Sequence, residues 1–209
     1  SKSLEESLLI INSLREMGFK KLITTPHVMS DCYKNDGEII SSGLLSLKNA
    51  ILKEKIDIEI EAAAEYYLDF DFQEKIGKEE FLTFGNKYIL VELSFLSRPD
   101  YLQDILFNLQ LNGYIIVLAH PERYQYLSMK DYEQLAGRGD LLQLNLLSLV
   151  GYYSDNIKKK SEFLIDQELI SLAGTDCHNM KHAESLKRCF NSKYWHKLMS
   201  SGNLLNSTL

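Results

Sequence analysis

Short apolar runs alternate with longer segments of helical periodicity along the whole chain. The short runs favour β-structure and predict strands over residues 21–25, 56–64, 88–93, 114–119, 141–145 and 170–175. The longer segments carry apolar residues at helical spacing and predict helices over residues 3–17, 38–53, 101–111, 130–136, 157–165 and 183–190. This alternation predicts an α/β fold with a parallel sheet and external helices, either doubly wound or closed into a barrel.

The first predicted helix has the clearest boundaries. Ser3 and Glu6 form the S-x-x-E capping pattern at its start, and Gly18 ends it. One apolar stripe runs along it, formed by Leu4, Leu8, Ile11 and Leu14. No linker and no internal repeat interrupts the chain, so we expect a single domain over residues 1–209, with residues 200–209 as a loosely packed tail.

Composition and charge exclude several classes of function. The 209 residues are 45% hydrophobic and 25% charged, as in ordinary globular proteins. With 23 basic against 29 acidic residues, the net charge of −6 provides no basic face for nucleic acid. No apolar run approaches the ~20 residues that cross a bilayer, and we recognise no export signal. Three widely spaced cysteines without a C-x-x-C pair favour a reducing cytoplasm over a disulfide framework.

Polar side chains stand at or just after the ends of the predicted strands. Successive positions are separated by 38, 27, 28, 25 and 31 residues, which is the length of one βα unit each time. Because enzymes of this architecture place their chemistry at the carboxyl ends of the strands, we expect these side chains to meet on one rim. They are His27, Glu65, Glu92, His120, Asn145 and Asp176, with His178 two residues further on.

Such a rim predicts bound metal ions. Three imidazoles and three carboxylates on one face are unfavourable unless a cation lies among them, and mixed nitrogen and oxygen ligands suit Zn, Mn or Fe. Two or three ions about 3.5–4 Å apart are typical of phosphoester hydrolysis. The candidate ligands are His27, Glu65, Glu92, His120, Asp176 and His178. Taken singly, each is more often a hydrogen-bonded or solvated rim residue than a ligand, and His178 with His182 at i, i+4 is an alternative metal-binding pair.

The segment His120-Pro-Glu-Arg123-Tyr adds a candidate anion binder. A guanidinium group binds phosphate oxygens in a bidentate fashion, although Arg123 paired with Glu122 in a loop is the alternative interpretation. Other catalytic schemes lack their motifs: no cysteine starts a C-x5-R sequence, and neither G-x-S-x-G, Walker A nor G-x-G-x-x-G occurs.

These motifs resemble the PHP (polymerase and histidinol phosphatase) superfamily, and within it the bacterial capsule and exopolysaccharide tyrosine phosphatases of the CpsB/CapC type. The similarity spans almost the whole chain and rests on SKSLEES, TTPH, AAAEYY, VELSF, VLAHPERY, LLQLNLLSLVG and GTDCHN. HPERY together with the final D-x-H is specific to this branch. The resemblance implies a distorted (β/α)7 barrel whose trinuclear cluster, usually manganese, hydrolyses phosphotyrosine on a kinase that regulates polysaccharide export.

The resemblance also implies roles for individual residues. Glu65, Glu92 and His120 would bind one metal, Glu65 and Asp176 a second, and His27 and His178 a third. Arg123 would hold the phosphate group. Lys181 stands where relatives often carry an arginine. Our candidate catalytic residues are therefore Arg123, Glu92 and His120, and our candidate substrate-binding residues are Arg123, Asn145 and Lys181.

Two alternatives to a protein-tyrosine phosphatase stay open at this point. The first is a PHP phosphatase that acts on a small metabolite such as histidinol phosphate. The second is a non-catalytic, metal-binding regulatory module. It is motivated by the H-x-H strand and following Asp that the family carries ahead of the segment matching SKSLEES, whereas the printed chain starts at Ser1 and lacks that first strand of the barrel.

Overall fold

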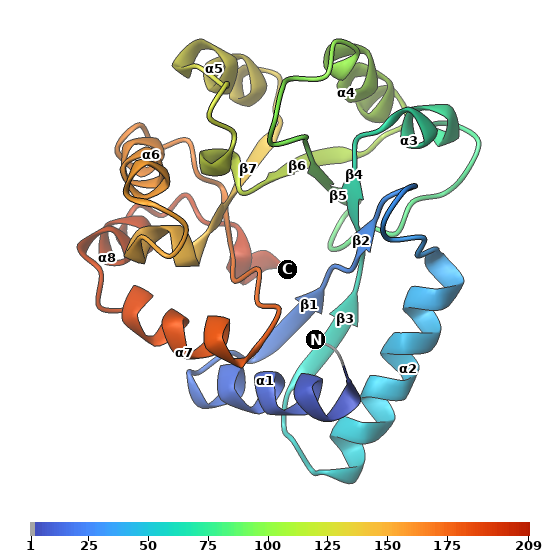
Figure 1. Cartoon of the computed structure of the whole chain (residues 1–209), viewed down its shortest axis with the longest axis vertical. Helices are drawn as coiled ribbons and strands as arrows, with labels where there is room; N and C mark the ends of the chain where they lie inside the picture. Colours follow the sequence, from blue (N-terminus) through green and yellow to red (C-terminus); the bar gives the residue numbers. More distant parts are fainter. Residues whose placement is uncertain (1–2) are drawn as a thin grey trace.

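The computed structural model describes residues 3–209, in which strands and helices alternate as the sequence predicts (Figure 1). The strands are β1 Lys21–Thr24, β2 His27–Val28, β3 Glu59–Ala62, β4 Glu65–Tyr67, β5 Tyr88–Glu92, β6 Ile115–Ala119, β7 Leu141–Asn145 and β8 Leu172–Gly174. The α-helices are α1 Leu4–Glu16, α2 Gly37–Lys53, α3 Phe70–Lys75, α4 Leu102–Leu111, α5 Met129–Gly137, α6 Asp155–Asp166, α7 Met180–Cys189 and α8 Lys193–Ser200. Short 3-10 helices are η1 Pro121–Arg123, η2 Leu146–Val150 and η3 Asn206–Thr208.

All strand pairs are parallel, and they form two sheets that continue into each other. Six strands pair in the order β2-β4-β5-β6-β7-β8, and β1 pairs with β3. Thr24 lies opposite Ala62 and His27 opposite Glu65, so both ladders share one register. Pro26 has no N–H group to continue the ladder between them, although its carbonyl accepts a hydrogen bond from the Glu65 N–H at 3.1 Å. The interruption divides what would otherwise be one pair of long strands.

The parallel α/β architecture is confirmed, but a closed seven-stranded barrel is not formed. Helices surround the strands, as Figure 1 shows, yet across residues 3–209 no ladder joins β8 to β1. The C-terminal segment is bonded to β8 instead. The Asn206 side chain accepts from the Ala173 N–H and donates to the Ala173 carbonyl, both at 2.9 Å, and the Leu205 N–H donates to Ser171. The tail that we expected to be loosely packed is thus fixed to the sheet.

The predicted strand at 56–64 is the least accurate of the expected elements. The structure divides this region into β3 and β4, so Glu65 begins a strand rather than following one. The pattern also did not predict β2, α3 and α8, because two to eight residues carry too little periodicity. In α1 the Ser3 side chain caps the helix as predicted, but the buried face is rotated, since Ile10 is buried while Leu4 is 42% exposed.

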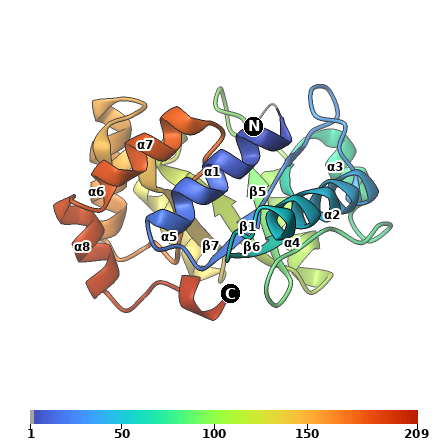
Figure 2. The same cartoon turned by 90° about the horizontal axis from the view of Figure 1, so that it is seen from below.

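Alternate residues of the sheet build two cores. Ile89 and Val91 of β5 face the surrounding helices, whereas Leu90 between them packs inside the sheet with Val117 and Ala119 of β6. Burial on both faces explains the continuous apolar runs, which are typical of parallel strands. Seen from below, α1 lies in front of the strands, between α2 and α7, and contacts both helices (Figure 2). No helix within residues 3–209 combines the length and apolarity that spanning a membrane requires.

We predict that Asn206→Ala lowers the free energy of unfolding by about 1 kcal/mol, because two hydrogen bonds to the edge of β8 are lost. Chemical denaturation of this variant and of Ser207→Ala, a change at the exposed neighbouring position, measures the effect. Equal stability of the two variants would show that the Asn206 contacts contribute nothing.

Candidate metal and phosphate site

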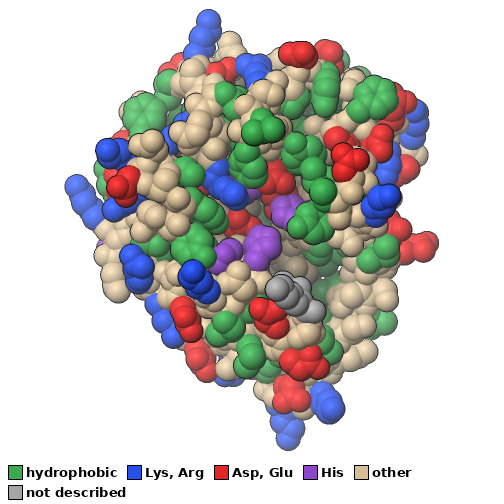
Figure 3. All heavy atoms as spheres, in the orientation of Figure 1, with side chains coloured by type: hydrophobic (Ala, Val, Ile, Leu, Met, Phe, Trp, Pro, Cys, Tyr) green, Lys and Arg blue, Asp and Glu red, His purple; other side chains and the backbone are tan. Residues whose placement is uncertain are grey.

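Most of the predicted site residues border one cavity at the carboxyl ends of the strands. Figure 3 shows histidine, acidic and basic side chains gathered in a hollow at the centre of this face. The cavity has a volume of about 360 Å³, and its lining includes five of the six candidate ligands: His27, Glu92, His120, Asp176 and His178. Glu65 is not part of the lining but contacts His120. The structure therefore brings together the side chains that the sequence predicts to converge.

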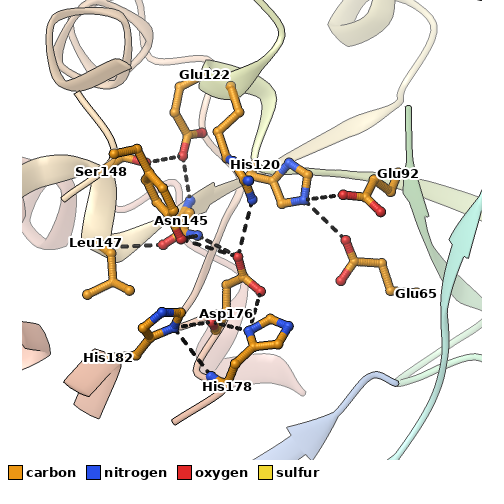
Figure 4. Close-up of polar contacts among 12 residues, drawn as sticks. Glu65, Glu92, His120, Glu122, Asn145, Leu147, Ser148, Asp176, His178 and His182 are labelled. Atoms are coloured by element: carbon orange, nitrogen blue, oxygen red, sulfur yellow. Dashed lines mark hydrogen bonds and ion pairs between the residues drawn. The ribbon is translucent and has the colours of Figure 1, made fainter. Parts of the chain in front are cut away.

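Two buried carboxylates and an imidazole form the most compact part of the site. Glu65 and Glu92 come from the neighbouring strands β4 and β5. Nε2 of His120 lies 3.2 Å from Oε1 of Glu65 and 3.3 Å from Oε1 of Glu92 (Figure 4). Nδ1 of His27 lies 3.5 Å from Oε2 of Glu92, and His27, Glu65 and Glu92 each offer a ligand atom within 4.8 Å of the other two.

The backbone at His120 is in the left-handed region, with φ 34° and ψ 57°. A residue before proline is normally extended, so this conformation must be held in place by its surroundings. The following turn is anchored on two sides: the Tyr132 hydroxyl donates to the Pro121 carbonyl at 2.8 Å, and Nζ of Lys160 donates to the Tyr124 carbonyl at 2.6 Å. Asp176 shares the positive φ, at 47°. Both residues follow strands whose chains turn sharply at the cavity.

The carboxylates control the protonation of His120. Burial by itself lowers the pKa of this imidazole, but its hydrogen bonds to Glu65 and Glu92 outweigh burial and raise the pKa to about 10. Burial raises the pKa of Glu92, yet the contacts with His120, His27 and Arg123 together bring that pKa below its usual value. The pair of buried anions therefore stabilises a positive charge at the Nε2 position.

A metal cation bound beside Glu65 and Glu92 would supply the same positive charge. The donor set of two carboxylates and two imidazoles is the mixture that Mn, Fe and Zn accept, and imidazole nitrogen ligates only when its proton has been released. The buried Nδ1 atom of His120 has no hydrogen-bond partner among the described residues. The Nε2 atom is the ring nitrogen that faces both carboxylates, so it is the one positioned to share a metal ion with them once its proton is released. The residues present fit a metal ion.

A second acidic group lies across the cavity. Oδ2 of Asp176 accepts a hydrogen bond from the Asn145 side chain at 2.8 Å and a longer one, 3.4 Å, from the Tyr153 hydroxyl. Oδ1 of Asp176 lies 3.3 Å from Nδ1 of His178. The rings of His178 and His27 stack at 5.9 Å, which connects this group to the first one.

Arg123 points toward Asp176 and not toward Glu122. Its Nη1 atom lies 3.5 Å from Oδ2 of Asp176, and its Cζ atom lies over the rings of Phe95 and Tyr153, 4.4 and 4.6 Å from the ring centroids. Glu122 is completely buried and accepts hydrogen bonds from the Asn145 N–H and the Ser148 hydroxyl. The loop pairing of Arg123 with Glu122 that we considered is not formed.

The other two candidate substrate-binding residues are placed differently. Both hydrogens of the Asn145 amide are used, one for Asp176 and one for the Tyr153 hydroxyl, while its oxygen accepts from the Leu147 N–H. Asn145 therefore positions Asp176 and has no donor left for a ligand. Lys181 is exposed in the first turn of α7 and does not line the cavity. His182 does line it, and its Nδ1 faces the backbone carbonyl of Asp176 at 3.2 Å.

Comparison with known proteins places this geometry in a family. The family of capsular polysaccharide synthesis proteins CpsB/CapC matches residues 1–201. The chain belongs to the CpsB/CapC family. Tyrosine-protein phosphatase YwqE of Bacillus subtilis is 28% identical over 179 residues, covering 84% of this chain and 70% of YwqE. Tyrosine-protein phosphatase CpsB of Streptococcus pneumoniae is 26% identical over 187 residues, covering 86% of this chain and 77% of CpsB.

The fold agrees with this assignment to the CpsB/CapC family. A crystal structure from work on YwqE of Bacillus subtilis and CpsB of Streptococcus pneumoniae, described there as metal-dependent tyrosine phosphatases, superimposes with a TM-score of 0.83. The two chains are 26% identical, and the match covers 96% of this chain and 85% of the other.

Three residues of this CpsB/CapC site were assigned no role in it by sequence reasoning. Glu122 was considered only as a surface partner, although its place inside HPERY, between a candidate ligand and Arg123, was a usable signal. Tyr153 follows the η2 turn after β7, and Phe95 follows β5 by three residues. Both stand near strand ends, but aromatic residues are too frequent in cores for position alone to reveal their contact with Arg123.

We predict that, in chelator-treated protein, the free energy of unfolding falls as the pH rises from 7 to 9. His120 has a folded-state pKa of about 10, above its unfolded value near 6.5, so its stabilising contribution is complete below pH 6.5 and is lost progressively above it. Denaturant titrations at several pH values measure the slope. His120→Gln should flatten the slope, whereas His196→Gln, on the exposed face of α8, should keep it. An unchanged slope in His120→Gln would contradict the assignment.

Proposed function

We propose that this chain is a metal-dependent protein-tyrosine phosphatase whose substrate is a tyrosine kinase of capsule or exopolysaccharide synthesis. The observation that carries the proposal is the arrangement of Glu65, Glu92 and His120 across one cavity from Arg123. Glu92 and His120 line the same cavity as Arg123, so groups suited to a cation and a group suited to an anion border one space. Membership of the CpsB/CapC family supports the substrate class.

Six side chains are our proposed metal ligands. Glu65, Glu92 and His120 make one set, His27 stands beside it, and Asp176 and His178 make the other. We infer two or three Mn²⁺ ions, with Zn²⁺ or Fe as alternatives, since ligands of this kind do not distinguish these metals strongly. When bound, such ions supply a hydroxide nucleophile near neutral pH and neutralise phosphate oxygens.

The chain's own residues orient the substrate. The rings of Phe95 and Tyr153 hold the Arg123 guanidinium group through cation–π contacts, and its N–H donors suit two parallel hydrogen bonds to phosphate oxygens. Asn145 and Tyr153 hold Asp176, so that the carboxylate is fixed before any ligand binds. A phenolate is a fair leaving group, with a pKa near 10, so a strong general acid is not required.

The reducing cytoplasm remains our proposed location. The three cysteines are free, and Cys177 and Cys189 are partly or wholly buried, where burial raises the pKa of both thiols. Neither thiol is activated as a nucleophile, which agrees with a metal-dependent rather than a cysteine-dependent phosphatase.

We predict that the protein releases phosphate from a phosphotyrosine peptide in the presence of Mn²⁺, that EDTA abolishes the reaction, and that histidinol phosphate is a poorer substrate. Phosphate release and metal binding, followed by calorimetry, are measured on the same preparation. Faster turnover of histidinol phosphate would establish the metabolite phosphatase instead. Tight metal binding without turnover of either ester would establish the regulatory module.

We predict that Arg123→Lys lowers kcat/KM for the phosphotyrosine peptide about 10- to 100-fold, because a lysine keeps the charge but not the two parallel donors. Arg98→Lys is the matched control, since Arg98 pairs with Asp131 outside the cavity and should retain full activity. Full activity of Arg123→Lys would exclude Arg123 from phosphate binding.

A further inference from the structure

We propose that Phe95 is an aromatic platform that selects aryl over alkyl phosphate esters. The inference rests on the proposed phosphatase function and assigns a specificity-determining role within that site. Phe95 lies in the loop between β5 and α4 and lines the cavity. The residue remains 43% exposed, although its ring packs on three side chains at once.

The contacts of Phe95 place its ring beside the anion-binding position. Cζ of Arg123 lies 4.4 Å from the ring centroid, and the rings of His120 and Tyr124 lie 5.5 and 5.6 Å away. Phe95 thus touches a candidate metal ligand and the candidate phosphate binder together. The ester group of a phosphate bound by Arg123 is therefore within reach of this ring.

The cavity is lined by ionic and by aromatic side chains, and these come from different parts of the fold. Its ionic groups come from the strand ends, whereas Phe95 and Tyr33 come from the loops after β5 and β2 and are both substantially exposed. Tyr33 packs on His27, with the ring centroids 5.3 Å apart. Two exposed aromatic rings therefore border a space whose polar groups suit a phosphate. A substrate with an anionic end and an aromatic ring matches this division, because offset or edge-to-face stacking favours an aryl group over an alkyl chain.

A second role of Phe95 has to be separated from the first. The Arg123 guanidinium lies over the Phe95 ring in a cation–π contact, so removal of the ring also loosens Arg123 and lowers the binding of every phosphate ester. That loss is equal for aryl and alkyl substrates. The ratio of the value for the aryl ester to the value for the alkyl ester therefore reports only the contact of Phe95 with the ester group.

The test measures kcat/KM with Mn²⁺ for two peptides of one sequence that carry phosphotyrosine or phosphoserine, and calorimetric binding of phenylphosphonate and methylphosphonate. Four variants are compared with the unchanged chain: Phe95→Leu, Phe95→Ala, Phe95→Trp and Leu96→Ala. Leu96, the neighbouring residue, is 92% exposed and does not line the cavity, so its variant controls for changes of the loop.

We expect Phe95→Leu and Phe95→Ala to reduce the aryl-to-alkyl ratio about three- to tenfold in both assays. Phe95→Trp should keep the ratio, and Leu96→Ala should match the unchanged chain. A uniform loss for all ligands in Phe95→Leu would overturn the inference and leave Phe95 as a positioning residue for Arg123. Selective phosphonate binding without hydrolysis would support the aryl platform while the proposed phosphatase function fails, so the two claims are separately testable.

Discussion

The central constraint in this structure is the burial of two carboxylates, Glu65 and Glu92, beside each other at the end of a parallel sheet. Strand pairing imposes this arrangement, because Tyr67 lies opposite Glu92 and Glu65 is two residues earlier on the same strand. Neither side chain can turn to solvent without breaking the ladder that supports it. Two buried anions at this distance require positive charge between them, and His120 from the next strand along, β6, supplies it.

The need for positive charge between the carboxylates explains the conformation of the HPERY turn. To bring the His120 ring between the carboxylates, the chain enters the left-handed region immediately before Pro121. Glu122 then points into the protein and binds the backbone of Asn145, which joins the turn to the end of β7. The Asn145 side chain in turn holds Asp176 after β8. A single chain of hydrogen bonds thus sets the relative positions of the two acidic groups, so the site is prearranged by the scaffold.

The sequence predicted the candidate metal ligands more completely than the strand pairing and loop contacts that hold them in place. Strand-end positions and their spacing identified all six candidate ligands, because the carboxyl ends of parallel strands must share a rim. Periodicity placed the long elements correctly, but it could not show that the run at 56–64 is interrupted, since the break depends on Pro26 in the partner strand. Nor could it show whether the strands close into a barrel, which depends on what bonds to the edge of β8. Contacts such as Arg123 between Phe95 and Tyr153 arise from loops that meet only in three dimensions.

The way in which Arg123 is held explains why it suits an anion that comes and goes. A close, bidentate ion pair with Asp176 would occupy the donors that a phosphate requires. The observed contact with Asp176 is long, at 3.5 Å, and involves one nitrogen. The rings of Phe95 and Tyr153 hold the guanidinium group through cation–π contacts, which use none of its N–H donors. Arg123 is therefore held by groups that do not compete with the substrate, and the N–H donors that Asp176 does not engage are left for the phosphate.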